Sequence, residues 1–313
     1  MIVKKVRLKL KWAWNDLLGT LGVGIKLNGH EGEVRVLCFH GVCEDHDPYI
    51  NGRFIRISQL RELLTELKKH VQFLSAEQFE RKELDPQRLN VLLTFDDGYM
   101  NNNTHLLPLL EEINLPALIF ITGETKALWM DLFDIADHTQ LSLDQLREVV
   151  QLPGASSKEL KQKVIHSKPE LVLKISELLH TLTKPVRKDY KIFHELLSDN
   201  VIKEFSKHPL IAIGNHTYSH FSFPFLSTEE MTNELSKCEE RLEQCLIEKN
   251  GRIALPFAHY NSEVIDHLKT CNYSHIFVDE IPLGKEEKII PRLTANPFIS
   301  IRNQIHAINN GKY

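Results

Sequence analysis

The stretch Val91-Leu-Leu-Thr-Phe-Asp-Asp-Gly98 runs from an apolar, β-rich segment directly into two adjacent acids and a glycine. Similar apolar segments alternate along the chain with stretches of helical periodicity, which is typical of parallel strands joined by crossover helices. The expected strands are Val34–Phe39, Val91–Phe95, Ala117–Ile121, Leu210–Ile213, Ile253–Phe257, His275–Val278 and Ile289–Leu293. The pattern predicts an α/β fold built on seven strands.

Helical periodicity marks the segments between these strands. The expected helices are Ser58–Lys69, Thr104–Ile113, Thr228–Lys249 and Ser262–Cys271. The third has a capping-box signature, because Glu230 follows Ser227 by three residues. Residues 132–208 break the alternation with a helical pattern of their own. We therefore expect a barrel domain over residues 31–313 with a helical insertion at about 132–208, preceded by an N-terminal helical extension over residues 1–30.

The composition argues against a nucleic-acid partner and favours a reducing compartment. A formal net charge of -4, without a basic face beyond the first dozen residues, predicts no nucleic-acid binding. The five cysteines are an odd number and form no Cys-x-x-Cys pair, which is typical of a reducing compartment. The expected location is cytoplasmic.

The amino terminus has two interpretations. Lys4, Lys5, Arg7, Lys9 and Lys11 alternate with apolar residues and precede two tryptophans, and no uninterrupted apolar run suits a secretion signal or a membrane span. One interpretation is peripheral contact of residues 1–28 with an anionic membrane surface, which places the chain at the inner face of the membrane. The other is an ordinary helix packed against the domain.

Notable polar and turn residues follow several of the expected strands. In a barrel of alternating strands and helices, active-site residues gather at the ends of the strands. Those residues here are His40 after the first strand, Asp96 and Asp97 after the second, His216 and His220 after the fourth, and Pro256 and Phe257 at the end of the fifth. The sequence therefore predicts that they meet in one site.

Two of these groups suit a metal ion. Adjacent acids repel each other, and a bound divalent cation is the simplest compensation, although an Asp-Gly turn capping a helix is the alternative. His216 and His220 are four residues apart, so on a helical turn both rings face the same way. Two imidazoles and one carboxylate leave a fourth zinc position for water. Zn²⁺ or another divalent ion is the expected cofactor.

Four segments resemble the motifs of the polysaccharide deacetylase family, the fourth family of carbohydrate esterases. Thr94–Gly98 and His216–His220 resemble its first two motifs, Leu37–Val42 resembles an early family segment, and Ala254–Phe257 resembles the third motif. The resemblance extends from about Val34 to Arg292 without the helical insertion.

The resemblance implies a distorted seven-stranded (β/α) barrel that removes acetyl groups from N-acetylated sugars of a polysaccharide or glycolipid precursor. It implies that Asp97, His216 and His220 hold the metal. By the same resemblance Asp96 is the general base, metal-bound water attacks the amide carbonyl, and the backbone N–H of Phe257 stabilises the oxyanion.

The chain departs from the family pattern in two places. The arginine that orients the base in the third motif is replaced by Ala254, and Arg292 on the last strand is our candidate substitute. The late Leu-x-His segment that supplies the general acid has no clean counterpart. His40 and His306 are the candidates, and a structural histidine is the alternative for each.

Trp129 begins a Trp-Met-Asp segment at the entry to the insertion. Relatives often place a tryptophan near the substrate opening, and an indole stacks well on a sugar ring. Trp129 and Pro256 are therefore the candidate substrate contacts, with plain packing as the alternative for Trp129.

Other functions remain open from sequence alone. One is removal of a formyl or other small acyl group from a sugar, and another is a carbohydrate-binding barrel with impaired catalysis, suggested by Ala254 and the missing acid. A lipid- or nucleotide-linked sugar at the cytoplasmic membrane face suits the basic amino terminus better than an external polymer.

Overall fold

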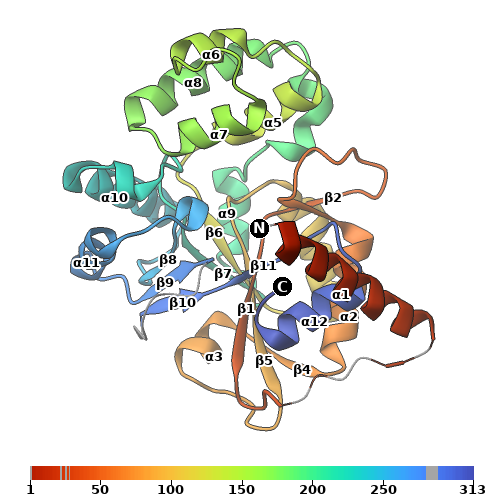
Figure 1. The fold of residues 1–313 in the computed structure, drawn as a ribbon. Coiled ribbons are helices and arrows are strands. Elements are labelled where there is room, and N and C mark those ends of the chain that lie inside the picture. The colour runs from red at the N-terminus through yellow and green to blue at the C-terminus, as the bar shows by residue number, and fades with distance from the viewer. Residues whose placement is uncertain (1, 22, 25–26, 28, 280–287) are drawn as a thin grey trace.

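The computed structural model describes residues 2–21, 23–24, 27, 29–279 and 288–313. Its main sheet is parallel throughout and curls into a nearly closed barrel (Figure 1). The strand order is β10-β9-β8-β7-β6-β5-β1-β11, and β4 pairs with the first half of β5. The strands are β1 Val34–Phe39, β4 Val71–Leu74, β5 Leu89–Phe95, β6 Ala117–Ile121, β7 Ile211–Asn215, β8 Arg252–Ala254, β9 His275–Val278, β10 Ile289–Pro291 and β11 Leu293–Thr294.

One short segment joins the two edges of this sheet. β10 pairs with β9, and β11 pairs with β1 at the opposite edge. Arg292 is the one residue between β10 and β11, and its N–H donates to the carbonyl of Val278. The single expected strand over 289–293 is therefore two short strands, one at each edge of the sheet, with Arg292 between them.

The expected strand over Ile253–Phe257 is too long. β8 ends at Ala254, and Pro256–Ala258 form a 3-10 turn in which Phe257 has a φ of 57°. β4 was not expected, nor was the small parallel sheet of β2 (Gly41–Cys43) and β3 (Phe54–Arg56). In contrast, all seven residues of β5 are buried, which explains its unbroken apolar run.

Helices surround the barrel (Figure 1). They are α2 Ile57–Lys68, α3 Ala76–Glu80, α4 Leu107–Ile113 with a π-helical turn at Asn102–Leu106 before it, α10 Thr228–Gln244, α11 Ser262–Thr270 and α12 Ile301–Asn310. α10 begins with the expected capping box of Ser227 and Glu230 but ends at Gln244, before the expected Lys249. α12 was not expected.

Between β6 and β7 the chain is helical. The helices are α5 Trp129–His138, α6 Asp144–Val149, α7 Ser157–Ile165, α8 Pro169–Leu182, a 3-10 helix at Arg187–Phe193 and α9 Asp199–Phe205. α5 to α8 gather at one end of the barrel (Figure 1) and share a hydrophobic cluster of their own. Met130 of α5 and Lys161 and Ile165 of α7 reach the pocket described below, so this layer forms one of its walls.

The amino-terminal helix α1 spans Ile2–Thr20 and packs against α12. The expected extension over residues 1–30 also includes residues 1, 22, 25–26 and 28, which lie outside the described residues. In the part of the chain that the structure describes, no helix is long and apolar enough to cross a bilayer.

Candidate metal centre and catalytic pocket

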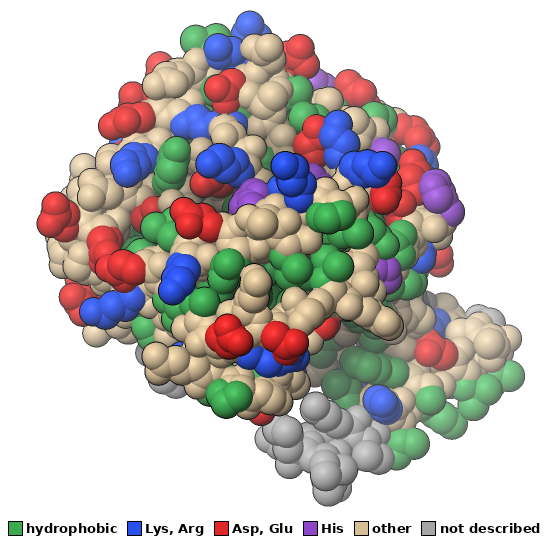
Figure 2. Space-filling view, turned by 90° about the horizontal axis from the view of Figure 1, so that it is seen from above, with side chains coloured by type: hydrophobic (Ala, Val, Ile, Leu, Met, Phe, Trp, Pro, Cys, Tyr) green, Lys and Arg blue, Asp and Glu red, His purple; other side chains and the backbone are tan. Residues whose placement is uncertain are grey.

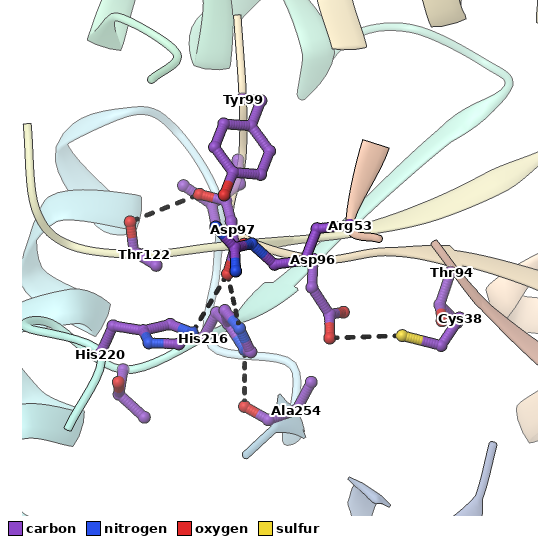
Figure 3. A network of polar contacts seen from close by, with 12 residues as sticks. Cys38, Arg53, Thr94, Asp96, Asp97, Tyr99, Thr122, His216, His220 and Ala254 are labelled. Atoms are coloured by element: carbon purple, nitrogen blue, oxygen red, sulfur yellow. Dashed lines mark hydrogen bonds and ion pairs between the residues drawn. The ribbon is translucent and has the colours of Figure 1, made fainter. Parts of the chain in front are cut away.

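Asp97, His216 and His220 converge although they come from two different strand ends. One ligand atom from each lies within 4.8 Å of the other two. The Nε2 atoms of His216 and His220 lie 3.2 and 3.1 Å from Oδ1 of Asp97 (Figure 3). All three side chains are almost completely buried. β5 delivers the acid and β7 delivers the histidines, so the barrel itself assembles the group.

The donor set fits a divalent ion. Neither buried oxygen of Asp97 accepts a hydrogen bond from any residue that the structure describes, although two imidazoles lie nearby. An ionised carboxylate buried without such partners is costly unless a cation compensates it. Ligands about 2.0–2.2 Å from a tetrahedral zinc ion lie roughly 3.4 Å apart, close to the separations observed here. We conclude that Asp97 is an unsatisfied acceptor placed where a cation fits.

The protonation states agree with this role. Burial raises the pKa of Asp97, but the two imidazoles outweigh burial and hold that pKa well below its usual value. Burial lowers the pKa of His220, which favours the neutral, metal-binding imidazole. Burial also lowers the pKa of His216, but Asp96 and Asp97 together with the carbonyl of Ala254 outweigh it and the net shift is upward. A bound cation would displace that proton.

The backbone around the site is strained. Asp97, Thr217, His220, Phe257 and Ala258 all have φ between 55° and 72°, in the left-handed region that side chains rarely adopt. Such residues cluster where a functional geometry is held by its surroundings. The expected helical turn from His216 to His220 is therefore wrong, because this segment is irregular. The two rings nevertheless meet, with centroids 5.0 Å apart.

Polar side chains that the sequence did not single out hold this segment. Oδ1 of Asn215 accepts from the N–H of Thr217 at 2.7 Å, and Glu234 of α10 accepts from the N–H of Ser219 at 2.6 Å. Nδ1 of His216 lies 2.8 Å from the carbonyl oxygen of Ala254. A donor–acceptor contact there fixes the ring and leaves Nε2 facing Asp97, as metal-bound histidines usually require.

Asp96 lies in a different environment from its neighbour. Arg292 donates to both of its oxygens at 2.7 Å, in a bidentate pair buried at the seam of the barrel. Burial raises the pKa of Asp96, but Arg292 together with His216 and His40 outweighs it and the net shift is downward. Arg292 also donates to Asp279 at 3.0 Å, a partner for which the sequence held no signal. Arg292 thus contacts Asp96 from its position between β10 and β11, within the segment in which we expected a substitute arginine.

A pocket of about 490 Å³ opens beside these groups. Its lining is His40, Arg53, Asp96, Met130, Lys161, Ile165, His216, His220, Leu255, Phe257, Ala258, Asp279 and Arg292. Trp129 and Pro256 are not part of this lining. Trp129 is buried against Phe257, and a direct contact of either residue with substrate stays a prediction. His306 lies on α12 and does not line the pocket, whereas His40 does.

A buried ionic network supports the wall formed by the helical layer. Arg53 pairs with Asp131 and Asp134 of α5, and the hydroxyl of Tyr99 donates to Asp131 at 2.9 Å. Lys161 of α7 also pairs with Asp134. Burial raises the pKa of Asp131 to about 7, against the opposing charge of Arg53. Asp131 was visible in the Trp-Met-Asp segment, but nothing in the sequence linked it to Arg53.

Comparison with known proteins connects this geometry to a family. The sequence model of the polysaccharide deacetylase family matches residues 84–276. No curated protein sequence matches the chain. Since the family match covers more than half of the chain, it identifies the family on its own.

Several solved structures share the fold. The deacetylase PplD of Streptococcus pyogenes, solved in complex with acetate, is 16% identical with a TM-score of 0.59, over 88% of this chain and 98% of that one. IcaB from Ammonifex degensii is 19% identical with a TM-score of 0.58, over 91% and 99%. A polysaccharide deacetylase from Bacillus cereus is 18% identical with a TM-score of 0.57, over 89% and 69%. At such identities the likeness concerns the fold, which is the expected barrel. The chain belongs to the polysaccharide deacetylase family, hydrolases that act on the carbon–nitrogen bond of N-acetyl groups.

Proposed function

We propose that this chain is a metal-dependent hydrolase that removes acetyl groups from N-acetylated sugars of a glycan or glycolipid precursor. Asp97, His216 and His220 hold the ion, which is Zn²⁺ or another divalent cation. The observation that carries the proposal is the convergence of three buried ligand atoms on Asp97, whose oxygens have no hydrogen-bond partner.

The reaction joins a water oxygen to the amide carbonyl carbon and breaks the bond from that carbon to nitrogen, giving acetate and a free amine. A divalent cation held at Asp97 supplies Lewis acidity, which polarises the carbonyl and acidifies water. Asp96 accepts the proton of the attacking water. Arg292 keeps this carboxylate ionised and fixes its orientation through the bidentate pair.

Two further groups complete the assignment. The backbone N–H of Phe257 donates to the oxyanion that develops on the carbonyl oxygen. His40 lines the pocket, and a ring nitrogen lies within 4.8 Å of a carboxylate oxygen of Asp96. We assign His40 as the donor of the proton that the leaving amine requires, because the other candidate, His306, lies away from the pocket.

The substrate assignment is a sugar whose acetamide reaches the floor of the pocket while the rest of the molecule extends from its mouth. A lipid- or nucleotide-linked sugar suits the expected cytoplasmic location. Membrane contact through residues 1–28, and a position at the inner face of the membrane, depend on helix α1 and not on this pocket.

The test compares acetate release by the wild type with release by two variants. The substrates are N-acetylglucosamine oligomers and lipid- or nucleotide-linked N-acetyl sugars, each with and without added zinc. We expect Asp97→Ala to lose both bound metal and turnover. We expect Asp96→Asn to retain the metal and lose about 10²–10⁴ in rate, as loss of a general base typically does.

Three outcomes would contradict the proposal. Sugar binding without acetate release on any substrate would favour a carbohydrate-binding barrel. Faster release of formate than of acetate from matched substrates would favour a deformylase. Equal metal content in the wild type and Asp97→Ala would remove the assigned metal site.

A further inference from the structure

Helix α1 presents a stripe of exposed hydrophobic side chains. Leu10, Trp14 and Leu17 follow one another at spacings of four and three residues, so they share one face of the helix, and Leu21 continues the series in the turn that follows Thr20. Between 47% and 69% of the surface of each side chain is exposed. In Figure 2 hydrophobic side chains gather on the projecting part of the molecule at the lower right, where α1 lies. A contiguous apolar stripe of this kind marks a contact surface.

The opposite face of α1 is fastened to α12. Asn303 of α12 is 2% exposed and donates to the carbonyl of Trp12 at 3.1 Å and to Asp16 at 2.9 Å. Asn15 donates back to Asn303 at 2.9 Å. These polar contacts set the rotation of the helix about its axis. The apolar stripe therefore faces outward while the helix is docked, and it is not the surface by which α1 packs on the barrel.

The charge beside the stripe is mainly positive, because Asp16, the one acid among residues 1–30, is turned toward α12, where Ser300 and Asn303 donate to it. The first 15 residues contain Lys4, Lys5, Arg7, Lys9 and Lys11 and no acid. Lys9 and Lys11 are exposed on α1. Two copies joined through this face would bring these cations together, which opposes self-association. An anionic bilayer instead offers hydrocarbon to the stripe and negative headgroups to the lysines.

We propose that the outer face of α1 binds the surface of an anionic lipid bilayer, with the helix axis along that surface. The inference goes beyond the deacetylase activity, because it uses a surface that contributes nothing to the pocket lining. The hydrophobic side chains enter the headgroup region, and the lysines pair with lipid phosphates.

The experiment is flotation of the full chain with two kinds of vesicle, one of phosphatidylcholine alone and one containing one third phosphatidylglycerol. We expect binding at least about tenfold tighter to the anionic vesicles. Added salt should weaken that binding, because it screens charges near the surface. Leu17→Gln and the double variant Lys9→Gln/Lys11→Gln should each weaken it by about tenfold.

The matched control is Leu246→Gln, which alters a leucine that follows α10 and is more exposed than Leu17, and it should leave vesicle binding unchanged. Thermal unfolding and acetate release from a soluble substrate monitor the fold of each variant. Equal binding to both vesicle types would overturn the proposal. So would a failure to bind vesicles together with a dimer that Leu17→Gln dissociates, since the stripe would then join two copies of the chain.

Discussion

The two adjacent acids at the end of β5 lie in opposite kinds of environment. Asp96 accepts two short hydrogen bonds from Arg292 and so has its charge compensated by the protein. Asp97 is equally buried, but its oxygens have no hydrogen-bond partner and face two imidazoles. The comparison separates a carboxylate that is paired with an arginine from one whose nearest polar groups are two imidazoles. We therefore expect substitutions around Asp96 and around Asp97 to have different effects on metal binding and activity.

The largest expected effect comes from removing the cation. Chelation should abolish acetate release in the wild type and lower its unfolding free energy by about 3 kcal/mol relative to protein with the ion at roughly 100 times its dissociation constant. Asp97→Asn removes the unpaired charge, so its thermal unfolding should not respond to chelator. Asp96→Asn is the control and should remain sensitive. Calorimetry with and without chelator checks all three proteins, and an unresponsive wild type would contradict the assigned role of Asp97.

Disrupting the Asp96–Arg292 pair should change the pH dependence of kcat/KM without loss of the metal. Arg292→Met leaves the buried carboxylate of Asp96 unpaired, which costs about 3–5 kcal/mol of stability. The pKa of Asp96 should rise, so the acidic limb of the kcat/KM profile should move to higher pH. In the wild type, the stabilisation from this pair is present above the carboxyl's unfolded pKa of about 3.9 and is lost as the pH falls through the lower folded pKa.

Arg252→Met is the matched control for Arg292→Met. Arg252 is also a buried arginine with acidic partners, the exposed Glu77 and the partly buried Glu80, but it lies away from the pocket. Arg252→Met should lower the free energy of unfolding without shifting the acidic limb of the kcat/KM profile. If both variants moved that limb equally, the link between Arg292 and the base would be lost.

A smaller effect is expected from His40→Gln. We expect a loss of about 10² in kcat on an N-acetyl sugar, because protonation of the leaving amine is then slow. On an aryl acetate, whose leaving group needs no proton, the loss should be much smaller. Steady-state rates on the two substrates test this, with His306→Gln as an unaffected control. An equal loss on both substrates would give His40 a role other than general acid.

The smallest effect concerns Trp129. Its side chain is 4% exposed and packs beside Phe257, at a ring-centroid distance of 6.3 Å. Trp129→Phe should raise KM for an oligosaccharide by less than about tenfold and leave kcat unchanged, since an aromatic contact contributes only about 0.5–1.5 kcal/mol. Trp14→Phe on α1 is the control. An unchanged KM would assign Trp129 to packing alone.

Much of the fold was predictable because its strands are short, continuous apolar runs. Val34–Phe39, Ala117–Ile121 and His275–Val278 are strands with the expected bounds. The secondary-structure predictions are wrong where contacts between distant residues, and not the local hydrophobic pattern, determine the backbone conformation. Phe257 continues an apolar run but adopts left-handed φ, and the segment from His216 to His220 is shaped by Asn215 and Glu234 instead of helical periodicity.

The sequence predicted those residues of the candidate site that follow the end of a strand. The sequence placed an arginine on the last strand, and Arg292 indeed contacts Asp96 in the fold. It gave no signal for Asp279, Arg53 or Tyr99, because each acts through a partner distant in sequence. Such contacts depend on how the barrel closes, and no spacing along the chain encodes that.

The position of Arg292 between two short strands has a consequence for assembly. The proposed metal ligands come from the ends of β5 and β7, both of which pair with β6 in the interior of the sheet. The partner of Asp96 arrives only when residues 289–294 join β9 to β1. A molecule in which residues 289–294 had detached from β9 and β1 would retain the proposed metal site but lose the partner of Asp96, and with it catalytic activity. Faster amide exchange over those residues, together with inactive but fully metallated protein, would reveal that state.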